Sequence, residues 1–366
     1  MPLFTRAFAC LLAAVASFAV LGGAAAAAPE PGSVYVLSNQ VAGNSVLEYA
    51  RAADGRLTFV AAHATGGVGT GGGLGSQGAV IVDRPGRYVY AVNAGSNSVT
   101  SFRVTAGGLE RVDIVGSQGI RPTSVTVRDG VLYVLNAGGD GNIAGFTTTN
   151  GDLEPIAGSA RPLSSNAAAA AQVSFTPDGD QLIVAERATN ALSLYRVGAD
   201  GLATGPTTVA SSGVTPFGFD FDNKGHVLVS EAFGGAADAS AASSYTIGDG
   251  ALDLVSGSVP TTETAACWLV VSNDGRFAYT GNAGTASITG YAVGTDGSLT
   301  ILDADGKTAS APAGVTDLAL SVNSKFLYAR MGNGTIGSYR VGSDGSLSDL
   351  GAAPGLPAGA AGIAAR

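Results

Sequence analysis

The chain has 366 residues, of which 46% are hydrophobic and 13% are charged, and this composition excludes a mainly disordered protein. Its formal net charge is −9, and its lysines and arginines form no cluster. A nucleic-acid groove or a patch for anionic membranes is therefore not expected.

The N-terminus has the pattern of a secretory signal peptide. Arg6 precedes the apolar run Ala7–Leu21, and the alanines Ala24–Ala28 supply small residues for cleavage. The run is short of the ~20 residues that span a bilayer, so an uncleaved anchor fits less well. We therefore predict that residues 1–28 are a signal peptide and that residues 30–366 form one exported domain. The domain should be periplasmic or extracellular, without stable membrane insertion.

Cysteine usage indicates how the mature chain is stabilised. Cys10 lies in the signal peptide, so Cys267 is the one cysteine that remains. It lies within the apolar run Ala265–Val271, which is typical of a buried small side chain. Since no pair of cysteines is left to form a disulfide, stability must come from packing.

A unit of four short strands recurs along the chain and is clearest between Arg121 and Ile156. Alternation of apolar and polar residues predicts its strands, which are Thr123–Val127, Val131–Leu135, Asn142–Phe146 and Leu153–Ile156. Tight turns at Arg128-Asp129-Gly130 and Asn150-Gly151-Asp152 separate them. One such sheet is too small to be stable alone, so the recurrence decides the fold.

Two columns of residues trace the recurrence. The residues that close the second strand are Asn39, Asn93, Asn136, Glu186, Glu231, Asn282 and Met331. The aromatic residues of the third strand are Tyr49, Phe102, Phe146, Tyr195, Tyr245, Tyr291 and Tyr339. Their spacing of about 43 to 54 residues predicts an all-β, seven-bladed propeller of four-stranded antiparallel blades. The aromatic residues are expected to pack between blades.

The two ends of the mature chain predict how the ring closes. Ser33–Ser38 matches a second strand with no first strand before it, and the tail Ala358–Ala365 resembles a first strand. Pairing of the tail with the N-terminal strands completes blade one and removes the open edge.

The predicted turns define two faces of the disc. Asp-Gly and Asn-Gly turns join first to second strands and third to fourth strands on one face, here called the tight-turn face. The remaining connections form the opposite loop face. Two unusual segments are expected there, Gly66–Gly78 and Gly234–Ala242, and each is interpreted either as a binding loop or as a tolerated surface insertion.

The polar column supplies the candidate site residues. Glu186 and Glu231 end strands of adjacent blades near the central channel, and paired carboxylates can perform acid–base chemistry. Asn93, Asn136 and Asn282 are candidate ligand-binding residues beside them. The alternative is that all five side chains cap strand ends.

Cationic and metal-binding candidates are few. Arg121, Arg187 and Arg330 are candidates for binding an anionic ligand, and Arg187 can instead pair with a glutamate. No zinc-ligand spacing and no G-x-S-x-G nucleophile turn is present, so no cofactor is predicted. A divalent cation at the channel mouth is the exception, because Glu186, Glu231 and the asparagine amides offer oxygen ligands.

Three stretches carry a family resemblance: VSFTPDGDQLIV (Val173–Val184), FGFDFDNKGHVLVSEAFGG (Phe217–Gly235) and ACWLVVSNDGRFAYTGNAG (Ala266–Gly284). They resemble the lactonase family of seven-bladed propellers, which includes bacterial 6-phosphogluconolactonases and fungal carboxymuconate cyclases. The resemblance implies the fold over the whole mature chain, and it implies that Glu231 stands at the position of a family glutamate.

The chain departs from that family at other site positions. Ala167–Ala171 and Gln172 occupy the region of a family histidine, and Pro216-Phe217-Gly218 stands where the family has Pro-Arg-His. Thr280-Gly281-Asn282 lacks a further arginine. The resemblance therefore predicts a divergent member without the named activities.

Two functions follow as hypotheses. The first is a propeller that binds a small molecule, glycan or protein on its loop face without turnover. The second is a divergent lactone hydrolase or cyclase, in which Glu231 is the general base, Glu186 tunes it, and Asn136 or Asn282 polarises the carbonyl. A purely structural envelope component is a third interpretation.

Overall fold

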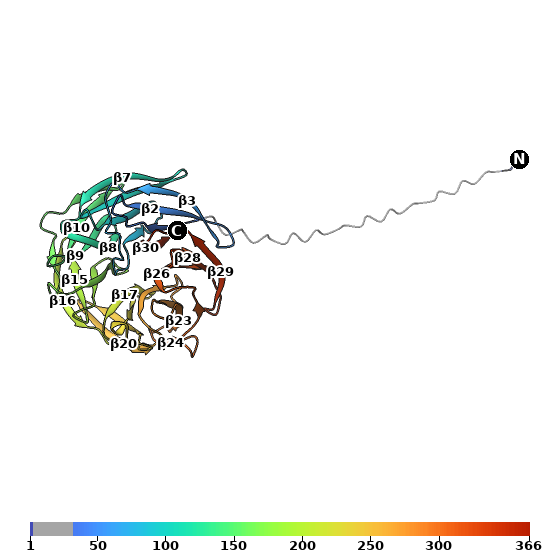
Figure 1. Ribbon diagram of the computed structural model, residues 1–366. Helices are drawn as coiled ribbons and strands as arrows, with labels where there is room; N and C mark the ends of the chain where they lie inside the picture. Colours follow the sequence, from blue (N-terminus) through green and yellow to red (C-terminus); the bar gives the residue numbers. More distant parts are fainter. Residues whose placement is uncertain (3–31) are drawn as a thin grey trace.

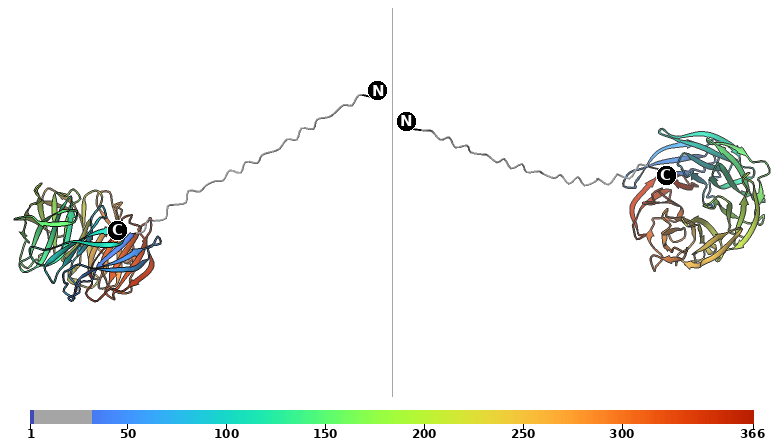
Figure 2. Two further views of the ribbon diagram at one scale, coloured as in Figure 1. Left: turned by 90° about the horizontal axis from the view of Figure 1, so that it is seen from above. Right: turned by 180° about the vertical axis from the view of Figure 1, so that it is seen from behind.

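The computed structural model describes residues 1, 2 and 32–366. Seven β-sheets are arranged in a ring around a central channel, as in a propeller (Figure 1). Figure 2 shows the same ring from above and from behind. The predicted seven-bladed fold is therefore confirmed. Residues 3–28 of the predicted signal peptide lie outside the described part of the chain.

Each sheet runs from an inner strand that faces the channel to an outer strand at the rim. The inner strands are β30 (Ala361–Ala365), β4 (Val80–Val82), β8 (Ile120–Arg128), β13 (Ala170–Phe175), β17 (Pro216–Phe221), β21 (Ala266–Val271) and β26 (Val315–Leu320). The second strands are β1 (Gly32–Leu37), β5 (Tyr88–Asn93), β9 (Val131–Gly138), β14 (Gln181–Glu186), β18 (His226–Glu231), β22 (Phe277–Asn282) and β27 (Phe326–Met331).

The outer half of each sheet repeats in the same way. The third strands are β2 (Ser45–Arg51), β6 (Ser98–Thr105), β10 (Asn142–Thr149), β15 (Ala191–Val197), β19 (Ala241–Gly248), β23 (Ser287–Val293) and β28 (Thr335–Val341). The outermost strands are β3 (Leu57–Ala64), β7 (Gly108–Gly116), β11 (Asp152–Pro155) with β12 (Arg161–Pro162), β16 (Ala203–Ala210), β20 (Ala251–Pro260), β24 (Leu299–Ile301) with β25 (Ala309–Ser310), and β29 (Leu347–Pro354). One 3-10 turn, η1 (Phe233–Gly235), follows β18.

The ring closes as the sequence predicts. Strand β30 pairs antiparallel with β1, so the C-terminal strand supplies the inner strand of the first blade. The hydroxyl of Tyr328 in blade seven also donates to the carbonyl of Gly55 in blade one at 3.0 Å. The same contact joins other blades, since the Tyr133 hydroxyl donates to Gly201 at 2.7 Å. Gly201 belongs to an Asp-Gly turn with a φ of 76°, a conformation that favours glycine.

The core lies between the sheets. The seven aromatic residues of the third strands are each at most 2% exposed, and they are divided among separate clusters of side chains that join neighbouring blades. Packing between blades therefore provides the stability that single sheets lack.

No helix within residues 1–2 and 32–366 is long and apolar enough to cross a bilayer.

Candidate functional site

The Glu186 side chain is fully buried at the end of β14 and is surrounded by hydrogen-bond donors. Oε1 accepts from the Ser164 amide at 3.0 Å and from the Ser193 hydroxyl at 2.8 Å. Oε2 accepts from the Ser164 hydroxyl and from the Thr189 hydroxyl, the latter at 2.9 Å. Both carboxylate oxygens are thus occupied by donors of the protein.

Glu231 occupies an equivalent cage in the next blade. Oε1 accepts from the Gly213 amide at 2.7 Å and from the hydroxyls of Ser243 and Ser211 at 2.6 and 3.2 Å. Oε2 accepts from the Ser258 hydroxyl at 2.7 Å, and the side chain is fully buried. Repetition of the cage in two blades indicates a capping role that ties each second strand to the adjoining loop. The catalytic roles of both glutamates stay predictions.

The asparagines of the column make similar contacts. Asn93 and Asn282 each donate to a serine and a threonine of the neighbouring third strand at 2.9 to 3.1 Å. Asn136 donates to the carbonyl of Ser117 at 2.9 Å. All three side chains are fully buried, and the carbonyl oxygens of Asn136 and Asn282 have no donor within residues 32–366. Their proposed ligand-binding role is untested by these contacts.

The three arginines of the loop face have different partners. Arg121 is exposed and has a left-handed φ of 56°. Arg330 in blade seven donates to the carbonyl of Thr316 at 2.6 Å, which holds it against its own blade. Arg330 also lies across from Asp317 in the β26–β27 ladder.

Arg187 contacts the mouth of the channel rather than a glutamate. Its Nε donates to the carbonyl of Ala169 at 2.8 Å, and its guanidinium lies 5.2 Å from the centre of the Phe217 ring. Burial raises the pKa of the nearby Cys267 thiol to about 12, which makes this cysteine unreactive.

The Gly-rich segment Gly66–Gly78 crosses the loop-face end of the channel. Asn39 holds its first half through a hydrogen bond from Nδ2 to the carbonyl of Gly72 at 2.6 Å. Further along, the Ser76 hydroxyl donates to the carbonyl of Thr123 in blade three at 2.8 Å. The segment is therefore hydrogen-bonded to blade one near its middle and to blade three near its end.

Gln77 completes this closure. Its side-chain amide donates to the carbonyl of Leu269 at 2.8 Å, and its carbonyl accepts from the Leu269 amide at 3.1 Å. The backbone amide of Gln77 donates to Ala171 in blade four, and the indole of Trp268 in blade six donates to the carbonyl of Ser76 at 3.0 Å. Because these contacts join the connection between blades one and two to blades four and six, they place Gln77 across the loop-face end of the channel.

Gly218 leaves the space that Gln77 fills. A Cβ atom at Gly218 would lie 2.1 Å from Oε1 of Gln77 and 2.8 Å from the carbonyl of Cys267. The family resemblance implies a histidine at the position of Gly218, and in this chain the Gln77 side chain occupies the space beside Gly218.

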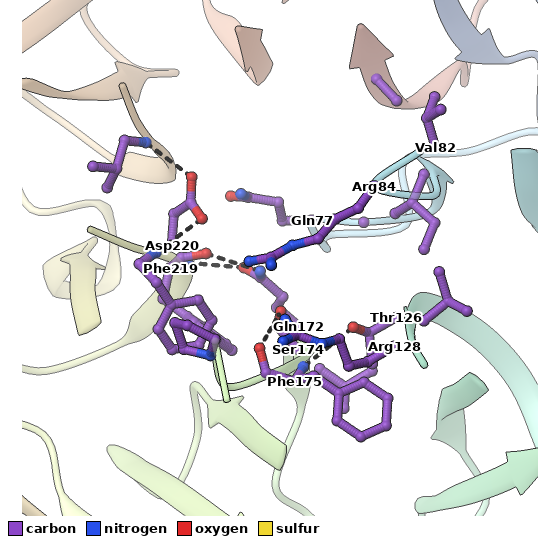
Figure 3. Close-up of a pocket in the computed structure, with 18 of the residues that line it drawn as sticks. Gln77, Val82, Arg84, Thr126, Arg128, Gln172, Ser174, Phe175, Phe219 and Asp220 are labelled. Carbon is purple, nitrogen blue, oxygen red and sulfur yellow. Dashed lines mark hydrogen bonds between the residues drawn. The ribbon is translucent and has the colours of Figure 1, made fainter. Parts of the chain in front are cut away.

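The channel is open at the opposite, tight-turn face. A cavity of about 720 Å³ is lined by inner strands of all seven blades, with Gln77 at its closed end (Figure 3). Arg84, in the turn after β4, and Arg128, the last residue of β8, lie at its open end. Sequence reasoning placed the functional cavity on the loop face and did not single out these two arginines. For Arg128, the predicted turn at Arg128-Asp129-Gly130 was the available signal.

The wall opposite Arg84 contains a carboxyl group. Asp220 on β17 accepts from the amides of Phe221 and Val271 at 2.8 and 2.9 Å. Burial among the channel walls raises its pKa to about 6, and the two backbone hydrogen bonds partly oppose that rise. The cavity therefore has cationic groups at its mouth and a carboxyl group of raised pKa in its wall, and the Asp222 side chain also lines it.

A divalent cation at the loop-face mouth, which the sequence left open, has no group of acidic or histidine ligands in the described part of the chain. Across residues 1–2 and 32–366, no group of three or more His, Cys, Asp or Glu side chains lies close enough to hold a metal ion. A cation bound by Glu186 and Glu231 would have to displace the hydroxyl and amide donors of both cages.

Two buried acids predict how stability depends on pH. Burial raises the pKa of Asp220 to about 6 and that of Asp317 to about 7, above the ~3.9 of an unfolded aspartate. Between about pH 4 and pH 7 the folded chain holds protons that the unfolded chain has released, so stability should fall as pH rises through this range. Asp317→Asn should flatten the slope by up to ~1.4 kcal/mol per pH unit.

Urea unfolding at a series of pH values measures this slope, and adding Asp220→Asn should flatten it further below about pH 6. Parallel curves for the wild-type chain and Asp317→Asn would show that Asp317 does not hold its proton in the folded state.

A β-bulge near the channel mouth recurs in the inner strands and was missed from the sequence. The pairing of inner and second strands shifts register at Pro122/Ser124, Ala170/Gln172, Pro216/Phe219, Ala266/Trp268 and Val315/Asp317. The residue before four of these bulges has a left-handed φ, and these residues are Arg121, Ala169, Thr215 and Ala265. The bulges turn the residues after them toward the channel, which sequence alternation alone does not reveal.

Comparison with known proteins places the chain beside one group of propellers. The family model described as "Lactonase, 7-bladed beta-propeller" matches residues 34–161 and 140–263. No curated protein matches the chain.

Several solved structures share the whole fold. A protein of Lactobacillus plantarum has 16% identity and a TM-score of 0.72, with 92% of this chain and 99% of that chain covered. The periplasmic gluconolactonase of Pseudomonas aeruginosa has 18% identity and a TM-score of 0.69, covering 90% and 98%. A Bacteroides fragilis protein assigned as a 6-phosphogluconolactonase has 17% identity and a TM-score of 0.68, covering 92% and 98%. At these identities the likeness shows the fold alone.

Proposed function

The chain belongs to the lactonase family of seven-bladed β-propellers, and from this premise we propose that it is an exported propeller that binds a small ligand in its central channel without turning it over. The observation that carries the proposal is the closure of the channel at the loop face by Gln77. A cavity of about 720 Å³ remains open on the other side, a size within the range of small-molecule sites.

The cages around the two glutamates also favour binding over hydrolysis. To act as a general base, Glu231 would have to exchange the Gly213 amide and three serine hydroxyls for a water and a substrate. Such a carboxylate is positioned to stabilise the fold. The leader-like pattern of residues 1–28 supports export.

The alternative function is a divergent lactone hydrolase or cyclase with Glu231 as general base. Glu231 favours it, because this residue stands at the position of a glutamate in the resembling family. A glycan or protein partner on the loop face is a second alternative. The exposed Ile120 and Arg121 beside the channel rim would be part of such a surface.

Proton release from a panel of neutral and carboxylated lactones separates binding from turnover. The mature wild-type protein should release protons no faster than buffer alone, because its glutamates are sequestered and its channel is closed at the loop face. Glu231→Gln is the matched control. If the wild-type protein hydrolyses a lactone and Glu231→Gln does not, the protein is a hydrolase and the binding proposal is wrong.

A further inference from the structure

The cationic end of the channel cavity is the feature that no assigned role explains. Arg84 comes from the turn after β4 in blade two and Arg128 is the last residue of β8 in the neighbouring blade three, and Figure 3 shows Arg84 extending into the cavity. Within residues 32–366, Arg84 forms no ion pair and no side-chain hydrogen bond. Arg128 pairs through Nε with the exposed Asp129 at 2.9 Å, which leaves its terminal nitrogens free for a ligand.

Other arginines of the tight-turn face do not share this state. Arg276 and Arg340 lie over aromatic rings, at 4.9 and 5.3 Å from the ring centres, and Arg196 pairs with Asp249 at 2.7 Å. The guanidinium groups of these three arginines already have partners within the protein. Arg84 therefore combines an unpaired guanidinium with a position inside a cavity.

The two arginines are unusual because the chain as a whole is acidic. The protein has a formal net charge of −9, yet two arginine side chains line the open end of its channel. A cleft with low-dielectric walls focuses the field of such groups and attracts anions. Guanidinium groups bind carboxylates through paired hydrogen bonds, which gives geometric selectivity as well as charge complementarity.

The rest of the cavity fits a small organic molecule. Val82, Val127 and Phe221 provide apolar wall, while Ser174 and the Asp220 carboxyl add polar groups one residue in from the ends of β13 and β17. A ligand with a carboxylate at one end and hydroxyls further along would match this order of groups.

We propose that the cavity binds a small hydroxylated organic carboxylate that enters from the tight-turn face, with its carboxylate at Arg84 and Arg128 and its hydroxyls toward Ser174 and Asp220. This assignment rests on the proposed binding function and specifies the class of ligand. It depends on residues that differ from Glu231 and the rest of the polar column.

Isothermal titration calorimetry at low ionic strength tests the proposal, with tartrate, citrate and galactarate as probes. Threitol and galactitol are neutral counterparts of similar size. The carboxylates should bind and the neutral polyols should bind at least about tenfold more weakly. Arg84→Ala should weaken carboxylate binding about tenfold or more, and Arg84→Lys should lose less.

Arg87→Ala is the matched control, because Arg87 belongs to the same face but lies over the Tyr88 ring and does not line the channel cavity. It should leave carboxylate affinity unchanged, and circular dichroism should confirm that both variants are folded.

Three results would overturn the assignment. They are equal affinity for polyols and carboxylates, an Arg84→Ala variant that binds like the wild type, or no heat from any carboxylate up to about 20 mM. The first two leave channel binding of small molecules in place. Failure of the proposed function itself would appear separately, as lactone turnover that requires Glu231.

Discussion

Removal of the C-terminal strand, residues 361–366, should prevent the mature chain from folding into a stable ring. Strand β30 is the inner strand of blade one, and its loss would expose the edge of β1 to the channel. Ile363 packs in the cluster that includes Phe326 and Tyr328 of blade seven, so the truncation also removes a contact between the first and last blades. The expected loss is on the order of 5 kcal/mol or more, comparable with the whole stability of a typical domain.

Thermal unfolding followed by near-ultraviolet circular dichroism measures this loss, together with the soluble yield. A chain that lacks Arg366 alone is the control, because it keeps all of Ala361–Ala365. A truncated chain with the wild-type melting temperature would mean that the ring does not depend on this strand.

Gly218→Ala should destabilise the protein strongly, because the new methyl group has no room beside the channel. The new Cβ would lie 2.1 Å from Gln77 Oε1, 2.8 Å from the Cys267 carbonyl and 3.0 Å from the Leu269 amide. Either the Gln77 side chain or the backbone of β21 must move, at an expected cost of about 2 to 4 kcal/mol in the free energy of unfolding. Gly116→Ala is the matched control, because nothing lies within 4 Å of its Cβ position.

The same variant in a Gln77→Ala background tests the cause of the damage. If Gln77 occupies the space at Gly218, Gly218→Ala should cost less in that background, which urea unfolding of the four chains measures as a coupling energy. Strictly additive costs would show that Gln77 does not fill this space.

The ring could be predicted because its determinants repeat. Asp-Gly turns such as Asp200-Gly201 mark hairpins, and the buried aromatic residues recur once in each blade. The C-terminal tail also pairs with β1 as predicted, because an unpaired edge of β1 would otherwise invite association with another chain. The four strands predicted between Arg121 and Ile156 all form, and their ends differ from prediction by at most three residues.

The channel could not be predicted in the same way, because its shape depends on single contacts between distant residues. Gln77 lies in a Gly-rich segment with no regular pattern, and its hydrogen bonds to the Leu269 backbone therefore leave no signal in the sequence. Glu186 and Glu231 resemble a catalytic pair in the sequence. Only their serine and threonine partners, which lie on other strands and loops, show that the carboxylates are already bound.

The central claim is that Gln77 closes the loop-face end of the channel, and exchange of the Leu269 amide tests it most directly. This amide faces the channel and donates to Gln77 Oε1 at 3.1 Å. Hydrogen exchange should be slow at Leu269 in the wild-type protein and much faster in Gln77→Ala, while the Val271 amide, which donates to Asp220, stays protected in both. Equally fast exchange at Leu269 in both proteins would contradict the closure and return the loop face to consideration as the entrance of the site.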